Sequence, residues 1–305
     1  MKTRIGILGL GGVGGYFGGL LAKAYFESDA IEIVFIARGE TQKAIAKNGL
    51  KIIADTTEIV AFPSLVSNVP EEIGKLDYLI CATKTYDIET SLESIKNCIT
   101  PNTILLPLYN GVDATERIQK LFPENTVLQG CVYIVSMIES SGIIKKIGSY
   151  EKLFFGSKNA PITNLNVLQS ILENANIESY LVENIEETVW EKFVFISALA
   201  SATTYLNVNI GGILNNPESK AIYCSLVNEI TTVAVARGVA LPDDIVAQTI
   251  IKLEKTPKDA TSSMHRDFLA GKSTEVVSLT KYVVDQAIKF GVATPVYQKI
   301  LEKLS

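Results

Sequence analysis

The sequence has few of the residues on which metal and disulfide chemistry depend: one histidine and four cysteines among 305 residues. A single histidine excludes a zinc site built from several histidines. The cysteines stand at positions 81, 98, 131 and 224, without a CxxC pair or a tight cluster, so neither a metal site nor a disulfide scaffold is expected. The chain also lacks a stretch of about 18 uncharged apolar residues, so no membrane-spanning helix is expected.

An excess of charge of one sign is missing as well. The 28 Lys and Arg residues oppose 33 Asp and Glu residues, the net charge is −5, and no long block carries one sign. This pattern argues against nucleic acid or a membrane surface as a partner. The first apolar run breaks at Gly9 and Gly11, which is too early for a signal peptide. Because unpaired cysteines suit a reducing compartment, we expect a cytoplasmic protein.

The chain does contain enough apolar residues, 47% of the total, to form two cores, and its length predicts about two domains. In the first half, short and nearly continuous apolar runs alternate with amphipathic segments. Such runs are typical of parallel strands that helices cover on both faces. The expected strands are residues 5–8, 31–36, 78–82, 104–106 and 126–128. The first half is therefore predicted to be a doubly wound α/β domain.

Two later parts of the chain follow other patterns. Between Val132 and Phe155, turn residues separate apolar runs, which predicts antiparallel strands that extend the sheet. Beyond them the spacing of apolar residues becomes helical. The expected helices are residues 185–204, 217–237, 243–255, 274–289 and 295–304. We therefore expect a first domain at residues 1–183 and an all-α domain at residues 184–305.

A GxGxxG motif follows the first expected strand, with its glycines at Gly9, Gly11 and Gly14. The first glycine allows a tight turn, the second lets the backbone approach a pyrophosphate, and the third lets the next helix pack closely on the strand. The helix N-terminus adds free N–H groups for the phosphates. The predicted Rossmann-type cofactor loop is Gly9-Leu10-Gly11-Gly12-Val13-Gly14. Further glycines in the following segment favour the alternative, a turn that is merely rich in glycine.

The end of the second expected strand carries no carboxylate. An acidic side chain there would bind the ribose of NAD, whereas this chain places Arg38 two residues beyond the strand. A guanidinium matches a 2′-phosphate in charge and geometry, so NADPH and NADP+ are favoured over the NAD pair. The alternative is a solvated surface arginine. Glu40 lies nearby, but beyond the strand end.

Polar residues also follow two later strands of the predicted sheet. Lys84 comes shortly after the strand at residues 78–82, and Asn110 follows the strand at residues 104–106. Open α/β sheets bind ligands at the carboxyl ends of their strands, so both residues are candidates for contacts with the cofactor or substrate. Taken alone, each is also compatible with a turn residue or a surface charge.

The helical half holds three more candidates. Lys192 lies among apolar residues, so it either reaches solvent along its own stem or is held in a crevice. Burial would lower its pKa and suit it to proton donation at neutral pH. Ser263 could hydrogen-bond a substrate carboxylate, and Glu275, twelve residues later, could bind a hydroxyl. For these two, capping and surface roles are the alternatives.

Taken together and in order, these residues resemble the ketopantoate reductase (2-dehydropantoate 2-reductase) family over nearly the whole chain. The matching features are the GxGxxG motif, Arg38, Lys84, Asn110-Gly111, Trp190-Glu191-Lys192, Ser262-Ser263-Met264 and Glu275. The resemblance implies an NADP-dependent oxidoreductase that reduces the 2-keto group of ketopantoate to pantoate with NADPH. That reaction is a step toward pantothenate and coenzyme A.

The resemblance also implies roles for single residues. Lys192 would be the general acid, and Glu275 would bind a substrate hydroxyl and support that lysine. Lys84 and Asn110 would line the nicotinamide and substrate crevice, and Ser263 would bind the substrate carboxylate. An ammonium near the carbonyl oxygen agrees with the chemistry, because hydride transfer places negative charge on that oxygen. The only histidine, His265, is expected to be a bystander on the rim.

The chain departs from the family pattern four and eight residues after Lys192, where the family has asparagines that contact substrate. Ile196 and Ala200 occupy these positions. Ser197 and Ser201 lie one residue further on, rotated by about 100° in a regular helix. They could replace the asparagines only if the helix overwinds or bulges.

Three functions therefore stay open at this stage. The first is reduction of ketopantoate, and the second is NADPH-dependent reduction of another small 2-keto acid. The third is a non-catalytic NADP(H)-binding sensor, which would need the glycines and Arg38 but no proton donor such as Lys192. Exposed apolar surface on the helical domain would suit either a homodimer or closure of the crevice, and the sequence is compatible with both.

Overall fold

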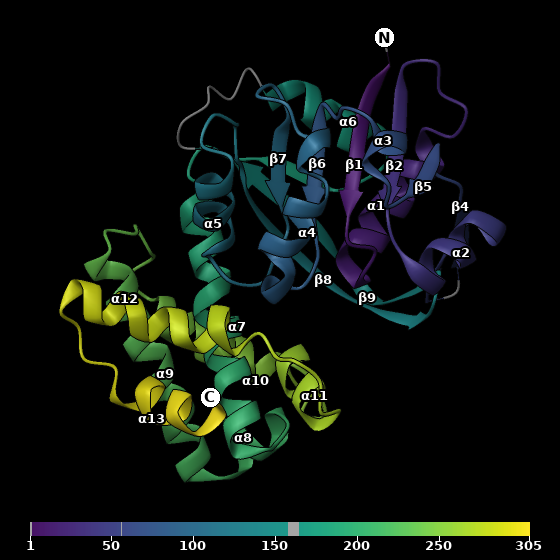
Figure 1. The fold of residues 1–305 in the computed structure, drawn as a ribbon. Coiled ribbons are helices and arrows are strands. Elements are labelled where there is room, and N and C mark those ends of the chain that lie inside the picture. The colour runs from purple at the N-terminus through teal and green to yellow at the C-terminus, as the bar shows by residue number, and fades with distance from the viewer. Residues whose placement is uncertain (1, 56, 158–164) are drawn as a thin grey trace. The chain divides into compact units, whose positions relative to one another are not determined.

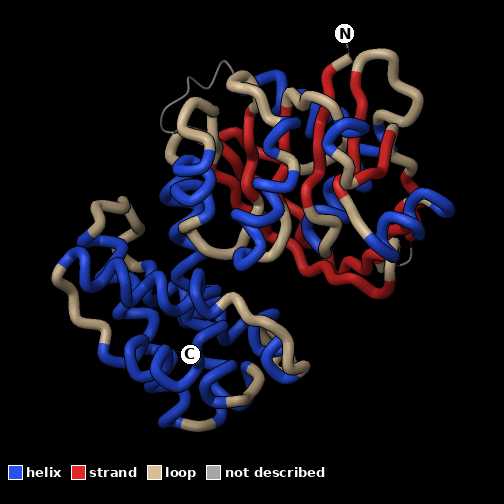
Figure 2. The backbone as a smooth tube through the Cα atoms, in the orientation of Figure 1, coloured by secondary structure: helices blue, strands red, loops and turns tan. Residues whose placement is uncertain are grey.

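The computed structural model describes residues 2–55, 57–157 and 165–305. The chain divides into two compact units, one with Met1–Tyr109 and Ala114–Ile185, the other with Asn110–Asp113 and Glu186–Ser305. Within the described residues, strands occur only in the first unit, and helices and loops make up the second (Figure 2). No helix in these ranges has both the length and the apolar character needed to traverse a bilayer.

The first unit contains a parallel sheet with the strand order β5-β2-β1-β6-β7 (Figure 1). Its strands are β1 (Thr3–Leu8), β2 (Ile31–Ile36), β5 (Leu65–Ser67), β6 (Tyr78–Cys81) and β7 (Ile104–Pro107). Neighbouring residues of a strand enter different cores: Ile7 and Ile80 pack in one, Leu8 and Leu79 in the other. Burial on both faces explains the continuous apolar runs. The doubly wound, Rossmann-type fold is confirmed.

Helices cover both faces of this sheet. Buried residues of α3 (Pro70–Ile73), α4 (Ile88–Ser94) and α5 (Ala114–Leu121) pack in the core that contains Leu8. Those of α1 (Gly12–Ala24), α2 (Gly39–Asn48) and α6 (Asn166–Asn174) pack in the core that contains Ile7. Two short 3-10 turns, η1 (Thr85–Asp87) and η2 (Lys96–Cys98), flank α4.

The expected antiparallel strands form, but they do not extend this sheet. The hairpin of β8 (Gln129–Ser140) and β9 (Ile143–Gly156) belongs to a second sheet with β3 (Leu50–Ala54), β4 (Thr57–Ala61) and β10 (Ser179–Leu181). The prediction that the hairpin extends the first sheet is therefore wrong. The expected strand at residues 126–128 is also wrong, because there only an isolated bridge joins Val127 to Leu105.

Helix α1 lies between the two sheets, which explains why its sequence is so rich in glycine. A Cβ atom on Gly18 would lie 3.0 Å from Ile7 in β1, and one on Gly19 would lie 2.6 Å from Ile52 in β3. Side chains at these positions would push the sheets apart. The glycines after the GxGxxG motif therefore serve packing, and they take nothing away from the motif itself.

The second unit is all-α, and turn chemistry sets several of its boundaries. Asn216 accepts hydrogen bonds from Glu218 N and Ser219 N at the start of α9, and Pro217 is the first residue of that helix. Gly291 ends α12 in a left-handed conformation, with φ of 67°. The helices are α7 (Ile185–Leu206), α8 (Ile210–Asn215), α9 (Pro217–Ala236), α10 (Ile245–Lys255), α11 (Ser263–Leu269), α12 (Tyr282–Phe290) and α13 (Pro295–Leu304).

The segment expected to be one helix at residues 274–289 is divided in the structure. It consists of a π-helical segment, Val277–Lys281, followed directly by α12. Glu275 lies two residues before the π-helical segment and therefore does not belong to a regular α-helix. π-helical turns are rare and are often found at functional sites.

Candidate functional site

A pocket of about 400 Å3 opens at the carboxyl ends of the strands in the first unit. This is where an open α/β sheet binds its ligands. Its lining residues follow four strands of the parallel sheet and include one residue of the hairpin. They are Leu8, Gly9, Leu10, Gly11, Ile36, Ala37, Arg38, Thr41, Asn68, Thr83, Asp87, Thr90, Ser91, Ser94 and Ile138.

The three glycines of the GxGxxG motif have different surroundings, so a side chain at each position would have a different effect. Gly9 has φ of +94°, and a Cβ there would lie 2.6 Å from Thr83 N. A Cβ on Gly14 would lie 2.0 Å from Gly9 O, so the helix could not begin where it does. A Cβ on Gly11 would meet only Ala82 O, at 3.9 Å. Because Gly11 lines the pocket, the free space beside it suits a ligand that approaches the backbone closely.

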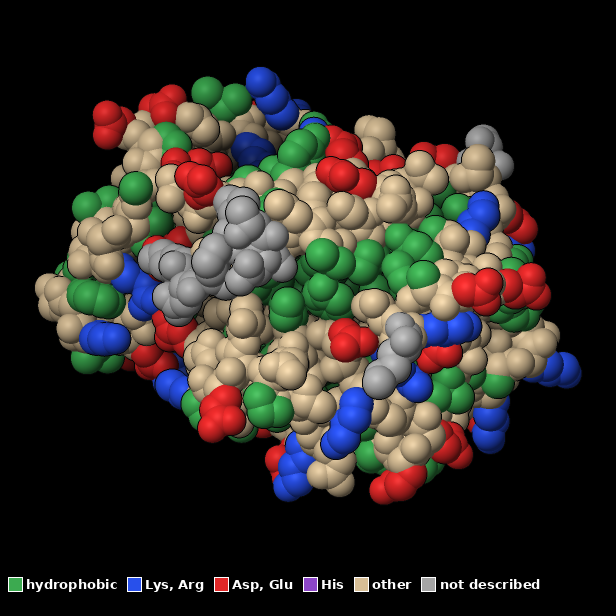
Figure 3. Space-filling model, turned by 90° about the horizontal axis from the view of Figure 1, so that it is seen from above, with side chains coloured by type: hydrophobic (Ala, Val, Ile, Leu, Met, Phe, Trp, Pro, Cys, Tyr) green, Lys and Arg blue, Asp and Glu red, His purple; other side chains and the backbone are tan. Residues whose placement is uncertain are grey.

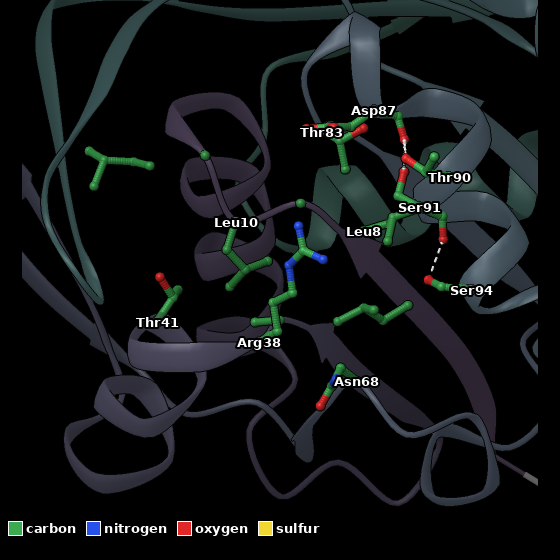
Figure 4. Close-up of a pocket in the computed structure, with 15 residues that line it drawn as sticks. Leu8, Leu10, Arg38, Thr41, Asn68, Thr83, Asp87, Thr90, Ser91 and Ser94 are labelled. Atoms are coloured by element: carbon green, nitrogen blue, oxygen red, sulfur yellow. Dashed lines mark hydrogen bonds between the residues drawn. The ribbon is translucent and has the colours of Figure 1, made fainter. Parts of the chain in front are cut away.

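Arg38 extends into the middle of this pocket beside Leu10, with Thr41 and Asn68 on either side of its base (Figure 4). It precedes α2 as its N-cap residue. The nearby carboxylate, Glu40, is exposed, forms an ion pair with Lys43 at 2.9 Å, and is not among the residues that line the pocket. A cationic guanidinium therefore stands where an acidic side chain would bind the ribose of NAD.

The pocket contains polar residues that the sequence analysis did not select. Thr90, Ser91 and Ser94 of α4 face it from the side opposite Leu10 (Figure 4). Thr90 and Ser91 lie four and three residues before Ser94, so the three side chains share one side of a helix that follows a strand end. The sequence already contained this signal. Ile138 comes from the β8–β9 hairpin, and only the arrangement of the second sheet brings it to the pocket.

Three predicted cofactor residues of the first unit lie next to the pocket lining. Gly12 and Val13 are the first two residues of α1, where backbone N–H groups lack partners within the helix. Lys84 is half-buried in the turn between Thr83 and Asp87, and both of those neighbours line the pocket. Lys84 itself is not among the lining residues.

In the second unit, Lys192 and Asn110 are in direct contact. Nζ of Lys192 donates a hydrogen bond to Oδ1 of Asn110 at 3.0 Å. An ammonium can only donate, so this contact orients the Asn110 amide with its NH2 group available as a donor. Lys192 is half-buried on α7, and Asn110 belongs by its contacts to the helical unit although it follows Tyr109 of the first unit.

Glu275 is almost completely buried, with 5% of its surface exposed. Its backbone oxygen accepts a hydrogen bond from Leu279 N at 2.9 Å. Leu279 O in turn accepts one from Ser197 Oγ at 2.5 Å. The helix that carries Lys192 is thus joined to the segment that follows Glu275.

Ser197 and Ser201 do not replace the missing asparagines. Ser197 also contacts Tyr297 OH at 2.7 Å, and Ser201 contacts Thr280 Oγ1 at 2.9 Å. Both serines are completely buried, and α7 is a regular α-helix at these positions. They therefore face the helical core and the π-helical segment, while Ile196 and Ala200 occupy the positions four and eight residues after Lys192.

Ser263 is the first residue of α11 and is half-buried. The preceding Ser262 caps this helix by accepting a hydrogen bond from His265 N, and its Oγ contacts Thr203 Oγ1 at 2.8 Å. Thr203 lies eleven residues after Lys192, about three helical turns along the same face of α7. The start of α11 therefore packs against the face of α7 that carries Lys192.

His265 is not on a rim as expected, because only 4% of its surface is exposed. Its Nε2 lies 2.9 Å from Asn207 Oδ1, and its Nδ1 lies 2.7 Å from Thr261 Oγ1. An amide oxygen can only accept, so Nε2 carries the proton and Nδ1 accepts from Thr261. The histidine is thus a buried, neutral link between α11 and the end of α7.

A titration should reveal this burial directly, since one histidine gives one imidazole signal in an NMR spectrum. Burial lowers the pKa of His265, so we expect a midpoint below the usual value of about 6.5. Because the pKa is depressed in the folded state, its contribution to stability is present above about pH 6.5 and is lost as the pH falls. A midpoint at or above 6.5 would contradict the buried, neutral assignment.

The fold and the pocket define the class of protein: a Rossmann-type domain, with a pocket where such domains bind their ligands, joined to an all-helical domain. The family model described as "Ketopantoate reductase PanE/ApbA" matches residues 5–160, and its C-terminal counterpart matches residues 184–305. The chain belongs to the ketopantoate reductase family, and it is an oxidoreductase of that family.

Three known proteins illustrate the similarity. The chain is 27% identical over 299 residues to "Uncharacterized oxidoreductase YkpB" of Bacillus subtilis, covering 98% of this chain and 96% of the relative. A crystal structure of 2-dehydropantoate 2-reductase from Porphyromonas gingivalis is 33% identical, covers 100% and 99% of the two chains, and has a TM-score of 0.87. The ternary structure of a D-mandelate dehydrogenase with NADH, 23% identical over 98% and 96% of the chains, shares the fold with a TM-score of 0.87.

Proposed function

We propose that this protein catalyses the NADPH-dependent reduction of 2-dehydropantoate to pantoate, a step of pantothenate and coenzyme A biosynthesis. The observation that carries the proposal is the contact between Lys192 Nζ and Asn110 Oδ1. This contact supports the proposal because an ammonium beside an oriented amide would supply the proton donation and the substrate positioning that a carbonyl reduction needs. The small-molecule 2-keto acid is the proposed partner.

The described residues of the first unit fit a dinucleotide. Gly9 and Gly14 shape the loop, Gly11 leaves room for a close approach to the backbone, and the N-terminus of α1 offers N–H groups to a pyrophosphate. Arg38 would bind the 2′-phosphate, and this assignment favours NADPH over NADH. A bound nicotinamide supplies the hydride in this chemistry.

The residues of the helical unit would supply orientation and a proton. Lys192 holds the proton at Nζ and donates it to the substrate oxygen as negative charge develops there. Asn110 would orient the carbonyl or the carboxylate through its NH2 group. Glu275 would bind a substrate hydroxyl and support Lys192, and Ser263, at the start of α11, would bind the carboxylate.

NADPH oxidation in the presence of 2-dehydropantoate tests the proposal. We expect turnover with this acid at a higher kcat/KM than with other small 2-keto acids measured in parallel. Lys192→Ala serves as the inactive control. Tight NADPH binding without turnover of any 2-keto acid would contradict an enzyme and would favour the sensor.

One observation favours a second candidate, the reduction of a 2-keto acid with an apolar side group. Ile196 and Ala200 follow Lys192 on one face of α7, and neither side chain can hydrogen-bond a substrate hydroxyl. The fold is shared with a D-mandelate dehydrogenase, so an aryl 2-keto acid belongs in the panel of substrates. Higher kcat/KM for the aryl or branched acid than for 2-dehydropantoate would support this candidate.

Replacing Arg38 with alanine should weaken NADPH binding by about 10- to 100-fold, or about 1.4–2.8 kcal/mol, because a charge-assisted contact with the 2′-phosphate is lost. NADH binding should change little, since NADH lacks this phosphate. Lys43→Ala is the matched control, because it removes the same charge from α2 at a residue that does not line the pocket. Equal losses for NADPH and NADH would refute the phosphate contact.

A further inference from the structure

The loop Asn110–Asp113 is held to the helical unit at both ends. At one end Asn110 Oδ1 accepts from Lys192 Nζ at 3.0 Å. At the other, Asp113 Oδ2 accepts from Ser278 Oγ at 2.9 Å. Asp113 is 7% exposed and Ser278 is 1% exposed, so the second hydrogen bond is shielded from water and is strengthened by the charge of its acceptor.

The loop between these two contacts is short and tightly packed. Only two residues separate Asn110 from Asp113. One of them, Gly111, has φ of +109°, and a Cβ there would lie 3.1 Å from Asp113 Oδ1 and 3.4 Å from Ser278 Cβ. Fixing Asp113 therefore leaves Asn110 little freedom to move.

Ser278 stands on an element that is itself anchored. It is the second residue of the π-helical segment Val277–Lys281, which begins two residues after Glu275. Ser197 and Ser201 of α7 hold this segment through Leu279 O and Thr280 Oγ1. The segment is thus fixed to the helix that carries Lys192 on one side and to the loop that carries Asn110 on another.

We propose that Asp113 and Ser278 are positioning residues: their buried hydrogen bond holds Asn110 and the segment after Glu275 in one arrangement around Lys192. The proposal rests on the proposed function, in which Lys192, Asn110 and Glu275 are the residues that act on the substrate. A displacement of about 1 Å in such a set costs on the order of 100-fold in rate. Because neither Asp113 nor Ser278 lines the pocket of the first unit, their variants should affect kcat and leave NADPH affinity unchanged.

The test compares Asp113→Ala, Ser278→Ala and the double variant with the wild type, using the 2-keto acid that the wild type turns over best. We expect each single variant to lower kcat by at least about tenfold with an unchanged Kd for NADPH. Because both changes break the same hydrogen bond, the double variant should be no slower than the slower single variant. Asp113→Asn, which keeps an acceptor oxygen for Ser278, should restore most of the rate.

The matched control is Ser219→Ala, which removes a buried serine hydroxyl from α9 in the same unit and should leave kcat unchanged. Losses that multiply in the double variant, or a kcat within about twofold of wild type in either single variant, would overturn the proposal. If the wild type turns over no 2-keto acid, the proposed function fails instead. The hydrogen bond is then tested by amide exchange, where Ser278→Ala must accelerate exchange at residues 110–113 and Asp113→Asn must not.

Discussion

Replacing Lys192 with alanine is expected to lower kcat by at least about 100-fold, because the proposed general acid for the developing alkoxide is lost. The Kd for NADPH should not change, since the residues that line the pocket proposed to bind it all belong to the first unit. Steady-state assays with 2-dehydropantoate, together with a fluorescence titration of NADPH, separate the two effects.

Two further variants make this test sharper. Lys192→Arg keeps the positive charge but holds its proton too tightly to donate it, so it should remain slow if the proton is what matters. Lys220→Ala removes an exposed lysine that pairs with Glu254 and should behave as wild type. A Lys192→Ala variant with more than about a tenth of the wild-type kcat would rule out Lys192 as the general acid.

Alanine substitutions in the glycine loop should separate folding from cofactor binding. Gly14→Ala places a Cβ 2.0 Å from Gly9 O, so we expect little soluble, folded protein. Gly11 has φ of −76°, and a Cβ there would lie 3.9 Å from its nearest neighbour, Ala82 O. Gly11→Ala should therefore fold with the wild-type Tm. Its methyl group would occupy the space through which a pyrophosphate would approach, and the Kd for NADPH should rise by at least about 100-fold, or about 2.8 kcal/mol.

Thermal unfolding and an NADPH titration on the same preparations decide the outcome. A Gly11→Ala variant that binds NADPH as tightly as the wild type would show that no ligand approaches the backbone there. One that loses stability as Gly14→Ala does would show that Gly11 serves the fold. Either result would remove the glycine loop as support for the cofactor site.

The distribution of charged side chains on the surface limits the kinds of partner that this protein can bind through electrostatic attraction. The face in Figure 3 carries acidic and basic side chains interspersed, without a continuous basic field. This agrees with the net charge of −5.

Local signals in the sequence were enough to predict most of the parallel sheet and the long helices. The strand at residues 31–36 has the predicted bounds, and the helix expected at residues 295–304 begins at Pro295 as the capping rule requires. Short elements such as β5, α8 and α11 were missed because three to seven residues carry too little periodicity. The π-helical segment was missed because its contacts are with Ser197 and Ser201, which lie about 80 residues earlier in the chain.

The residues of the candidate site also fall into those that local sequence could reveal and those that it could not. Gly9, Gly11 and Arg38 could be found because each has a defined place relative to a strand end. Ile138 and the Asp113–Ser278 hydrogen bond could not, since the two residues of that pair lie 165 positions apart and nothing local relates them. Ser197 and Ser201 could have replaced the missing asparagines only if α7 overwound or bulged, and their side chains instead form hydrogen bonds within the helical unit.

The sequence by itself determined the class of fold and the place of the glycine loop, because these depend on residues close together in the chain. The resemblance of nearly the whole chain to one family singled out Lys192 as the candidate proton donor. The tertiary structure decided that the hairpin builds a second sheet, that α1 is rich in glycine because it is packed between two sheets, and that the single histidine is a buried link. These outcomes depend on which distant segments pack together. Side-chain volume and hydrogen-bond geometry settle that choice only when the whole chain has folded.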